Sequence, residues 1–279
     1  MQAFHEHRPY NPDFPISIAR SYNLTFMPHW HRDVELVYVS RGSLKMGINQ
    51  ENYVLYGGDM AVAGSRDIHY FENLQKNTEV YLVIFHPEVI GHPAGWPAEK
   101  RFLSPFLVSS LVDKGAMDNQ VLESLRQSIQ RIYREQEEAK EGYSLFIKSR
   151  IYDICATLIR YFPSVSIDTR MEQSRLRNLK RIQAVLQYID NHYTRRITLE
   201  EAASQENLSP FHFSRLFKST LGMTFKKYVN RVRINHAEAL LQNSDLSITD
   251  IAFECGFESI RTFNRVYRSI KGASPSETR

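Results

Sequence analysis

One sequence pattern occurs twice in the last third of the chain, and this repeat constrains the fold more than any single residue does. The first copy runs from Leu199 to Gly222 and the second from Ile248 to Gly272. The offset between them is 49 residues before an internal turn and 50 residues after it. A pattern repeated in this way indicates two copies of one supersecondary unit.

Each copy has the pattern of two short helices joined by a tight turn. Asn207 and Gly256 occupy equivalent turn positions, and both residue types tolerate the left-handed conformation that such a turn requires. Ser209 and Ser259 precede the second helices as candidate N-caps. Apolar residues at helical spacing form the inner faces of these second helices, namely Phe213, Leu216 and Phe217 in the first copy and Phe263, Val266 and Tyr267 in the second.

The outer faces of the second helices carry arginine and small polar residues, which suit the reading of bases in a DNA major groove. Between the two copies, the apolar spacing of residues 224–243 predicts one helix of about 30 Å. A spacer of this length suits two recognition helices that lie about 34 Å apart, or one turn of DNA. The sequence therefore predicts two helix-turn-helix units that read successive major grooves.

The C-terminal stretch resembles the DNA-binding domain of the AraC/XylS family of bacterial transcriptional regulators, from near Leu179 to the C-terminus. The most specific part is residues 247–259, SITDIAFECGFES, followed by residues 272–275, GASP. One departure is Asn207, where the first unit of the family often has Gly. The resemblance implies binding to a double-stranded DNA operator, and matching positions give nine candidate DNA-binding residues: Phe211, His212, Ser214, Arg215, Lys218, Ile260, Arg261, Asn264 and Arg265.

The charge distribution supports this interpretation. Residues 171–279 contain 17 Lys and Arg against 11 Asp and Glu, whereas residues 1–170 contain 18 against 20. The positive charge gathers with the repeat, as contact with phosphates requires. The chain has neither an apolar run near the roughly 18 residues of a membrane span nor a signal-peptide pattern. Cys155 and Cys255 are too few for a disulfide framework, so we expect a cytoplasmic protein.

The whole chain is predicted to have a multi-domain α+β fold. Short apolar or alternating runs within residues 16–86, separated by glycine-containing turns, indicate strands of a cupin-like barrel or jelly roll. Two amphipathic patterns, over residues 118–139 and 143–162, indicate helices. The predicted boundaries are an N-terminal arm at 1–15, the barrel at 16–105, a helical dimerisation region at 106–162, a linker at 163–175 and the DNA-binding domain at 176–279.

The resemblance also implies partners besides DNA. In relatives the helices after the barrel form a dimer interface, so a homodimer is expected. The alternative is that these helices only cover the barrel. A small-molecule effector bound in the barrel is expected, with a sugar or related metabolite as the commonest analogue. Contact with RNA polymerase, activation or repression, and the operator sequence stay open at this point.

A polar spacing within the predicted barrel resembles the two cupin motifs: His29-x-His31-x3-Glu35, followed by His69. In metal-binding cupins these four positions hold a metal ion, and three imidazoles with a carboxylate suit transition metals. The second motif departs from the pattern, however, at Gly64 and Arg66, where cupins often have Pro and Gly. We therefore expect no metal or other cofactor. The candidate effector-binding residues are His29, His31, Glu35, Tyr38 and His69.

These features favour a transcriptional regulator that is controlled by an effector and is not an enzyme. Two alternatives stay open. One is a metal-dependent cupin enzyme fused to a DNA-binding domain, which requires an ion at the four cupin positions. The other is a regulator without a small-molecule effector, which a barrel filled by its own side chains would favour.

Overall fold

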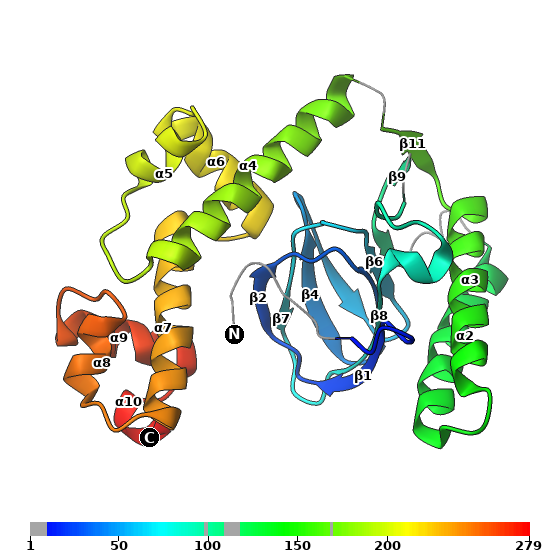
Figure 1. Cartoon of the computed structure of the whole chain (residues 1–279), viewed down its shortest axis with the longest axis horizontal. Coiled ribbons are helices and arrows are strands. Elements are labelled where there is room, and N and C mark those ends of the chain that lie inside the picture. Colours follow the sequence, from blue (N-terminus) through cyan, green and yellow to red (C-terminus); the bar gives the residue numbers. More distant parts are fainter. Residues whose placement is uncertain (1–9, 98–99, 109–117, 168–169) are drawn as a thin grey trace. The chain divides into compact units, whose positions relative to one another are not determined.

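The computed structural model describes residues 10–97, 100–108, 118–167 and 170–279. The chain divides after Arg177 into two compact units, two residues beyond the predicted end of the linker. Figure 1 shows strands and helices in the N-terminal unit, and helices in the C-terminal unit. The predicted arm at 1–15 is described only from Tyr10 onward.

The N-terminal unit contains two antiparallel sheets, as the alternating pattern predicts. Their strand orders are β1-β8-β3-β6-β10 and β2-β7-β4-β5, and a third, two-stranded sheet pairs β9 with β11. The strands of the two larger sheets are β1 (Ile16–Tyr22), β2 (Phe26–His29), β3 (Val34–Arg41), β4 (Ser43–Ile48), β5 (Glu51–Tyr56), β6 (Met60–Ala63), β7 (His69–Asn73), β8 (Glu79–Phe85) and β10 (Phe106–Leu107).

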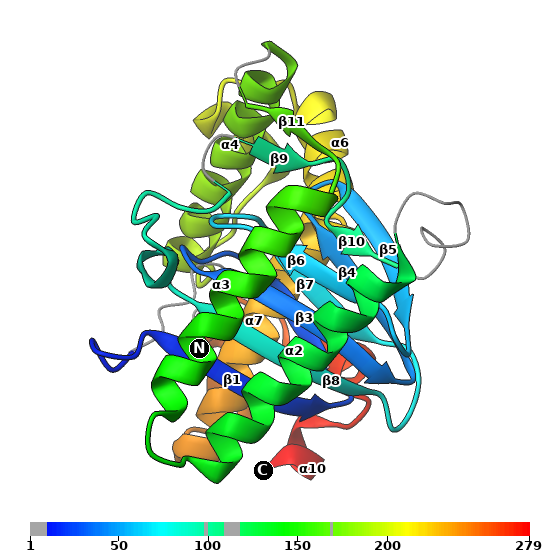
Figure 2. The same ribbon diagram turned by 90° about the vertical axis from the view of Figure 1, so that its right-hand side faces the viewer.

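Strand β3 shows why this unit has two cores. Its side chains alternate, so Val37 and Val39 point into the barrel interior while Leu36 and Tyr38 point the other way. The interior is packed with buried apolar side chains from both sheets, such as Met46. The second core lies between the outer face of the larger sheet and the two helices that cross it, α2 (Asn119–Glu138) and α3 (Tyr143–Tyr161), as Figure 2 shows.

The two helices agree with the sequence prediction to within one residue at each end. Six strands agree to within two residues with the apolar or alternating runs of the sequence, at 16–20, 35–39, 45–48, 52–56, 60–62 and 80–85. The structure adds β2, β7 and β10, which the sequence pattern did not reveal, and β10 lies at the start of the region predicted to be helical. The stretch Pro87 to Pro105 is more than the predicted loop, because it contains a 3-10 helix, η1 (Pro87–Ile90), and β9 (Lys100–Phe102). The predicted linker contains β11 (Ser164–Ser166), which pairs with β9.

The C-terminal unit is helical throughout its described length. Its first helix is α4 (Arg170–His192), which begins six residues before the predicted start at Leu176. The remaining helices are α5 (Leu199–Gln205), α6 (Pro210–Leu221), α7 (Phe225–Asn243), α8 (Ile248–Glu254), α9 (Ile260–Lys271) and α10 (Pro275–Thr278). Helix α7 has the pair α5–α6 at one end and the pair α8–α9 at the other (Figure 1).

Aromatic side chains fix these pairs onto α7. Phe217 of α6 packs edge-on against Phe225 and Tyr228 of α7, with ring centroids 5.5 and 5.7 Å apart. At the other end, Phe263 and Tyr267 of α9 share a buried cluster with α7 and α8. The repeat pattern therefore places its apolar residues against one shared helix.

The two cysteines of the chain, Cys155 and Cys255, are both free thiols and both buried. Burial raises the pKa of the Cys155 thiol to about 12, so it is unreactive at neutral pH.

In the part of the chain that the structure describes, the helices lack the combination of length and apolar character that a membrane span needs.

Candidate DNA-binding face and buried polar cluster

The turns of both helix-turn-helix units have the predicted local structure. Asn207 and Gly256 have φ angles of 53° and 79°, in the left-handed region. The Ser209 hydroxyl accepts a hydrogen bond from the backbone N–H of His212. The Ser259 hydroxyl accepts the equivalent bond from Thr262. Because these caps satisfy N–H groups that a helix start leaves unpaired, α6 and α9 begin at fixed residues.

The predicted DNA-binding residues lie on the outer faces of α6 and α9. All nine are exposed except Ile260, which is half-buried. Phe211 is 77% exposed, which is unusual for an aromatic side chain without a partner molecule. The Arg215 guanidinium lies over its ring, 5.9 Å from the centroid. The structure thus presents one mixed aromatic and basic face and one more basic face to solvent.

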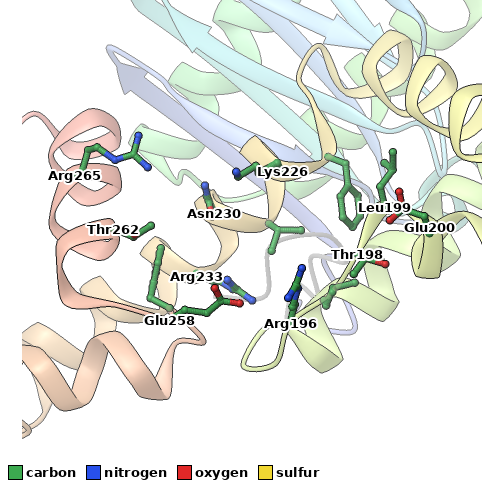
Figure 3. A pocket seen from close by; sticks show the side chains of 14 residues that line it. Arg196, Thr198, Leu199, Glu200, Lys226, Asn230, Arg233, Glu258, Thr262 and Arg265 are labelled. Carbon is green, nitrogen blue, oxygen red and sulfur yellow. The ribbon is translucent and has the colours of Figure 1, made fainter.

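A groove between the two helix-turn-helix units adds cations that the sequence pattern did not single out. It is lined from α5, α7 and α9 and from the segments that precede α5 and α9 (Figure 3). Arg196, Lys226 and Arg233 line this groove together with Arg265. The acidic side chains Glu200 and Glu258 lie at its edges. No repeat signal marks the first three cations, because Lys226 and Arg233 lie in the spacer and Arg196 lies before the first copy.

Arg233 of α7 contacts segments that precede the second helix-turn-helix unit's recognition helix and the first unit. Its Nε donates to the carbonyl of Tyr193 at 2.8 Å, and its Nη2 donates to the carbonyl of Arg195 at 2.7 Å. The guanidinium lies 5.7 Å from the ring centroid of Phe257, in the turn of the second unit. One side chain of the spacer therefore contacts the segment before α5 and the turn before α9.

The four cupin-like positions form a second site, the polar cluster, which consists of His29, His31, Glu35 and His69. His29 ends β2 and pairs in register with His69 at the start of β7. Glu35 lies on the interior face of β3, and His31 lies in the segment between β2 and β3. All four side chains are at most 1% exposed. Their ligand atoms lie within 4.8 Å of one another.

Glu35 is the centre of the hydrogen bonding in the polar cluster. Its Oε2 lies 3.1 Å from Nε2 of His31 and 3.1 Å from Nε2 of His69. Burial raises the pKa of Glu35, but the two histidines outweigh that effect and hold the pKa well below its ordinary value. Burial lowers the pKa of His29, and neighbouring His69 lowers it further.

Tyr38 does not join the polar cluster, although the sequence grouped it there. It lies three residues after Glu35 on β3, so its side chain points to the opposite face of the sheet. There it stacks on Tyr81, with ring centroids 5.9 Å apart, and its hydroxyl accepts a hydrogen bond from Gln130 of α2. Tyr38 therefore belongs to the core between the sheet and the helices.

Comparisons with known proteins match both parts of the chain. A model described as an AraC-like ligand binding domain matches residues 11–155, and one described as a helix-turn-helix domain matches residues 202–279. The HTH-type transcriptional activator RhaS of Shigella sonnei is 25% identical over 254 residues, which cover 91% of this chain and 87% of RhaS. RhaS of Escherichia coli has the same identity and coverage.

Two solved structures are also similar to this chain, one over its C-terminal part and one over most of its length. The C-terminal domain of AraT, a response regulator from Geobacillus stearothermophilus, is 31% identical with a TM-score of 0.35, over 36% of this chain and 83% of that domain. An apo ToxT variant from Vibrio cholerae is 14% identical with a TM-score of 0.45, over 97% of this chain and 98% of ToxT. The ligand-binding-domain match alone spans more than half of the chain. The chain therefore belongs to the AraC family of transcriptional regulators, with an N-terminal ligand-binding domain and a C-terminal helix-turn-helix domain that binds DNA.

Proposed function

We propose that this regulator binds a double-stranded DNA operator with both helix-turn-helix units, under the control of an effector held by its N-terminal unit. The observation that carries the proposal is the pair of recognition helices, α6 and α9, with equivalent caps and exposed basic faces. Such a regulator acts on DNA in the cytoplasm and performs no catalysis of its own.

The two recognition helices supply matched side chains for base reading. Arg215 and Arg265 occupy equivalent positions, and an arginine can donate two hydrogen bonds to a guanine edge. Ser214 and Asn264 are likewise equivalent, and asparagine suits adenine. The other predicted residues flank these positions and serve in contacts to sugar, phosphate and thymine methyl groups: Phe211, His212, Lys218, Ile260 and Arg261.

The groove between the units is proposed to receive the DNA backbone where it passes from one major groove to the next. Lys226 and Arg196 are exposed cations in this groove, and Arg265 borders it from α9. Phosphate contacts fix the register of a protein on DNA without reading sequence. The groove is therefore assigned to positioning, and the two recognition helices to specificity.

The DNA-binding proposal is tested by selection from random duplexes with the full-length protein. We expect enriched duplexes with two half-sites about 10 base pairs apart, centre to centre. Specific binding should exceed non-specific binding by at least about 10³-fold at physiological salt. Enrichment of a single half-site would restrict the proposal to one unit, and no enrichment would remove it.

The effector-binding part of the proposal is centred on the polar cluster, without Tyr38. The barrel interior next to it is filled by apolar side chains such as Val37, Met46 and Phe71. This packing favours a small ligand at the cluster over a whole sugar. The test is whether a ligand bound by the wild type changes operator affinity. A ligand that binds with equal affinity to the free and DNA-bound protein would not be an effector.

A homodimer through α3 is part of the proposal. Leu145, Tyr152 and Ile159 are exposed and lie seven residues apart, with Ser149 and Ala156 between them. Spacing of four and three residues is the pattern of a two-helix seam, and a second copy of α3 offers the matching stripe. We expect Ile159→Asp to give a monomer by sedimentation, whereas Arg160→Asp on the adjacent face keeps the dimer. Identical behaviour of both variants would exclude the seam.

Activation of transcription completes the proposal. The relative RhaS is named as a transcriptional activator, and activation by a DNA-bound regulator implies contact with RNA polymerase. In transcription with purified polymerase, the protein should raise synthesis from a promoter that carries the selected operator. A decrease would make the protein a repressor.

A further inference from the structure

The polar cluster has a feature that hydrogen bonding among its own side chains does not explain. The Nδ1 atoms of all three histidines face backbone carbonyls. His29 contacts the carbonyl of Met27 at 2.9 Å, His31 that of Asp33 at 3.1 Å, and His69 that of Asp67 at 2.9 Å. A carbonyl only accepts, so each Nδ1 carries the proton. Each neutral ring therefore presents a lone pair on Nε2.

Without a metal ion, the Nε2 lone pairs of the histidines face the negatively charged carboxylate of Glu35, and only added protons can relieve the repulsion. Its Oε2 lies 3.1 Å from Nε2 of both His31 and His69, but one shared proton satisfies only one of these contacts. Protonating both rings would instead place two cations next to each other, with ring centroids 4.9 Å apart, in a site that is at most 1% exposed. Burial of like charges without full compensation is costly.

A divalent cation at the centre removes the conflict, because every Nε2 lone pair and the carboxylate can then donate to it. The ligand atoms lie within 4.8 Å of one another, and a metal with bonds of about 2.0–2.2 Å holds its ligands roughly 3–4 Å apart. The two contacts of 3.1 Å already have the required spacing. The backbone bonds to Nδ1 are the outer contacts that usually orient metal-binding histidines.

We infer that His29, His31, Glu35 and His69 bind one divalent first-row transition-metal ion. Three imidazoles with one carboxylate suit zinc, manganese, iron, cobalt, nickel or copper, whereas magnesium and calcium prefer oxygen ligands. This inference rests on the proposed function in one respect: it names the ligand class of the proposed effector site. It revises the expectation of no metal, which came from Gly64 and Arg66 in the second motif.

The N-terminal arm is connected to this site through one residue. The Tyr10 hydroxyl donates to Oδ2 of Asp33 at 2.9 Å, and the carbonyl of Asp33 accepts the bond from His31. Lys148 of α3 contacts the carbonyl of Asp13, further along the same segment. The described part of the arm thus runs from an outer contact of the polar cluster to the helix with the proposed dimer seam.

The test uses the full-length protein, purified without chelator and then dialysed against Zn²⁺ or Co²⁺. Elemental analysis should give one ion per chain in the wild type. Glu35→Gln and His69→Gln should lose the ion, whereas His92→Gln, at an exposed histidine outside the site, should keep it. Wild-type protein without bound ion, or the same ion content in folded Glu35→Gln and His69→Gln, would overturn the inference.

A second measurement decides the matter if the cluster variants fail to fold. Co²⁺ bound to the wild type should show the intense visible absorption of a site with low coordination number and mixed nitrogen and oxygen ligands. The weak spectrum of hydrated Co²⁺ would overturn the inference. DNA binding by the same samples is scored separately, so metal-free protein that still selects an operator would leave the regulator proposal standing without the metal.

Discussion

The two helix-turn-helix units share a pattern but differ in how their turns are packed. Asn207 of the first turn is exposed. Gly256 of the second lies against the backbone, where an added Cβ would come within 2.5 Å of the Tyr193 carbonyl oxygen and 2.6 Å of the Thr194 carbonyl oxygen. The first turn only reverses the chain, whereas the second also packs on the segment between α4 and α5. Equivalent positions in a repeat therefore carry different structural constraints.

The exposed faces of α6 and α9 differ in chemistry as well. With the offset of 50 residues, Phe211 corresponds to Arg261, and Lys218 corresponds to Arg268. The first unit therefore offers an aromatic surface where the second offers a cation. Because the arginines at Arg215 and Arg265 are shared, the two units are expected to read related but unequal half-sites.

The largest expected difference between the two helix-turn-helix units is in the stability of variants at their turns. Gly256→Ala should lower the free energy of unfolding by about 2–4 kcal/mol, because the left-handed conformation and the backbone contact both oppose a side chain. Asn207→Ala should cost about 1 kcal/mol. Chemical denaturation of both full-length variants measures the difference. Equal costs would mean that the second turn is not held against the α4–α5 segment.

The next effect concerns operator affinity. Arg265→Ala and Arg215→Ala should each weaken specific binding by about 1–3 kcal/mol. If the units read separate half-sites, the losses in the double variant should add to within about 0.5 kcal/mol. Titration of the selected operator at fixed salt measures both quantities, with Arg160→Ala as a control on the N-terminal unit. Unchanged affinity in Arg265→Ala would remove that residue from base reading.

The caps provide a smaller effect that the two units should share. Ser209→Ala and Ser259→Ala each leave one N–H at a helix start without its side-chain acceptor, and each should cost about 1 kcal/mol of stability. Restoring the cap with Asp should recover most of the loss. A clear inequality between the two caps, measured by thermal unfolding, would show that the units also differ at their helix starts.

The smallest effect is expected in the groove between the units. Lys226→Ala should weaken binding to all DNA sequences alike and reduce the slope of log affinity against log salt by about 1. Lys227 is a matched control, because it is also exposed on α7 but does not line the groove. Equal slopes for Lys226→Ala and Lys227→Ala would exclude a specific role for the groove.

The metal inference adds a stability prediction outside this comparison. A chelator should lower the unfolding midpoint of the wild type by several degrees, because a ligand that binds only the folded state stabilises it. The unfolding midpoint of the DNA-binding unit should change little, since its core is built from side chains such as Phe263 and Tyr267 and the four proposed metal ligands lie in the N-terminal unit. Two separate transitions, of which only one responds to chelator, would be the expected thermal profile.

The sequence predicted the helical unit well because its signals are local. Caps such as Ser209 and Ser259, and apolar spacing as in residues 224–243, act within a few residues. The strands β2 and β7 were missed because they are short, and because Pro28 and the polar residues of β7 disguise the alternation. These two strands carry His29 and His69. The spacing grouped these residues in the sequence, but only strand pairing explains why they meet.

One assignment was wrong because sequence spacing alone does not say to which face of a strand a side chain points. Tyr38 was grouped with Glu35, although an odd separation on a strand places two side chains on opposite faces. The pairing of β11 with β9 joins segments far apart in sequence, which local composition does not report.

The sequence by itself determined the two-unit plan, the double helix-turn-helix and the identity of the side chains that face solvent on α6 and α9, since helix periodicity and caps are short-range properties. Tertiary structure decided the groove with Arg196, Lys226 and Arg233, the role of Gly256, and the orientation of three imidazoles around Glu35. These features join residues that are far apart in sequence. Their chemistry arises only when chain folding brings the residues together.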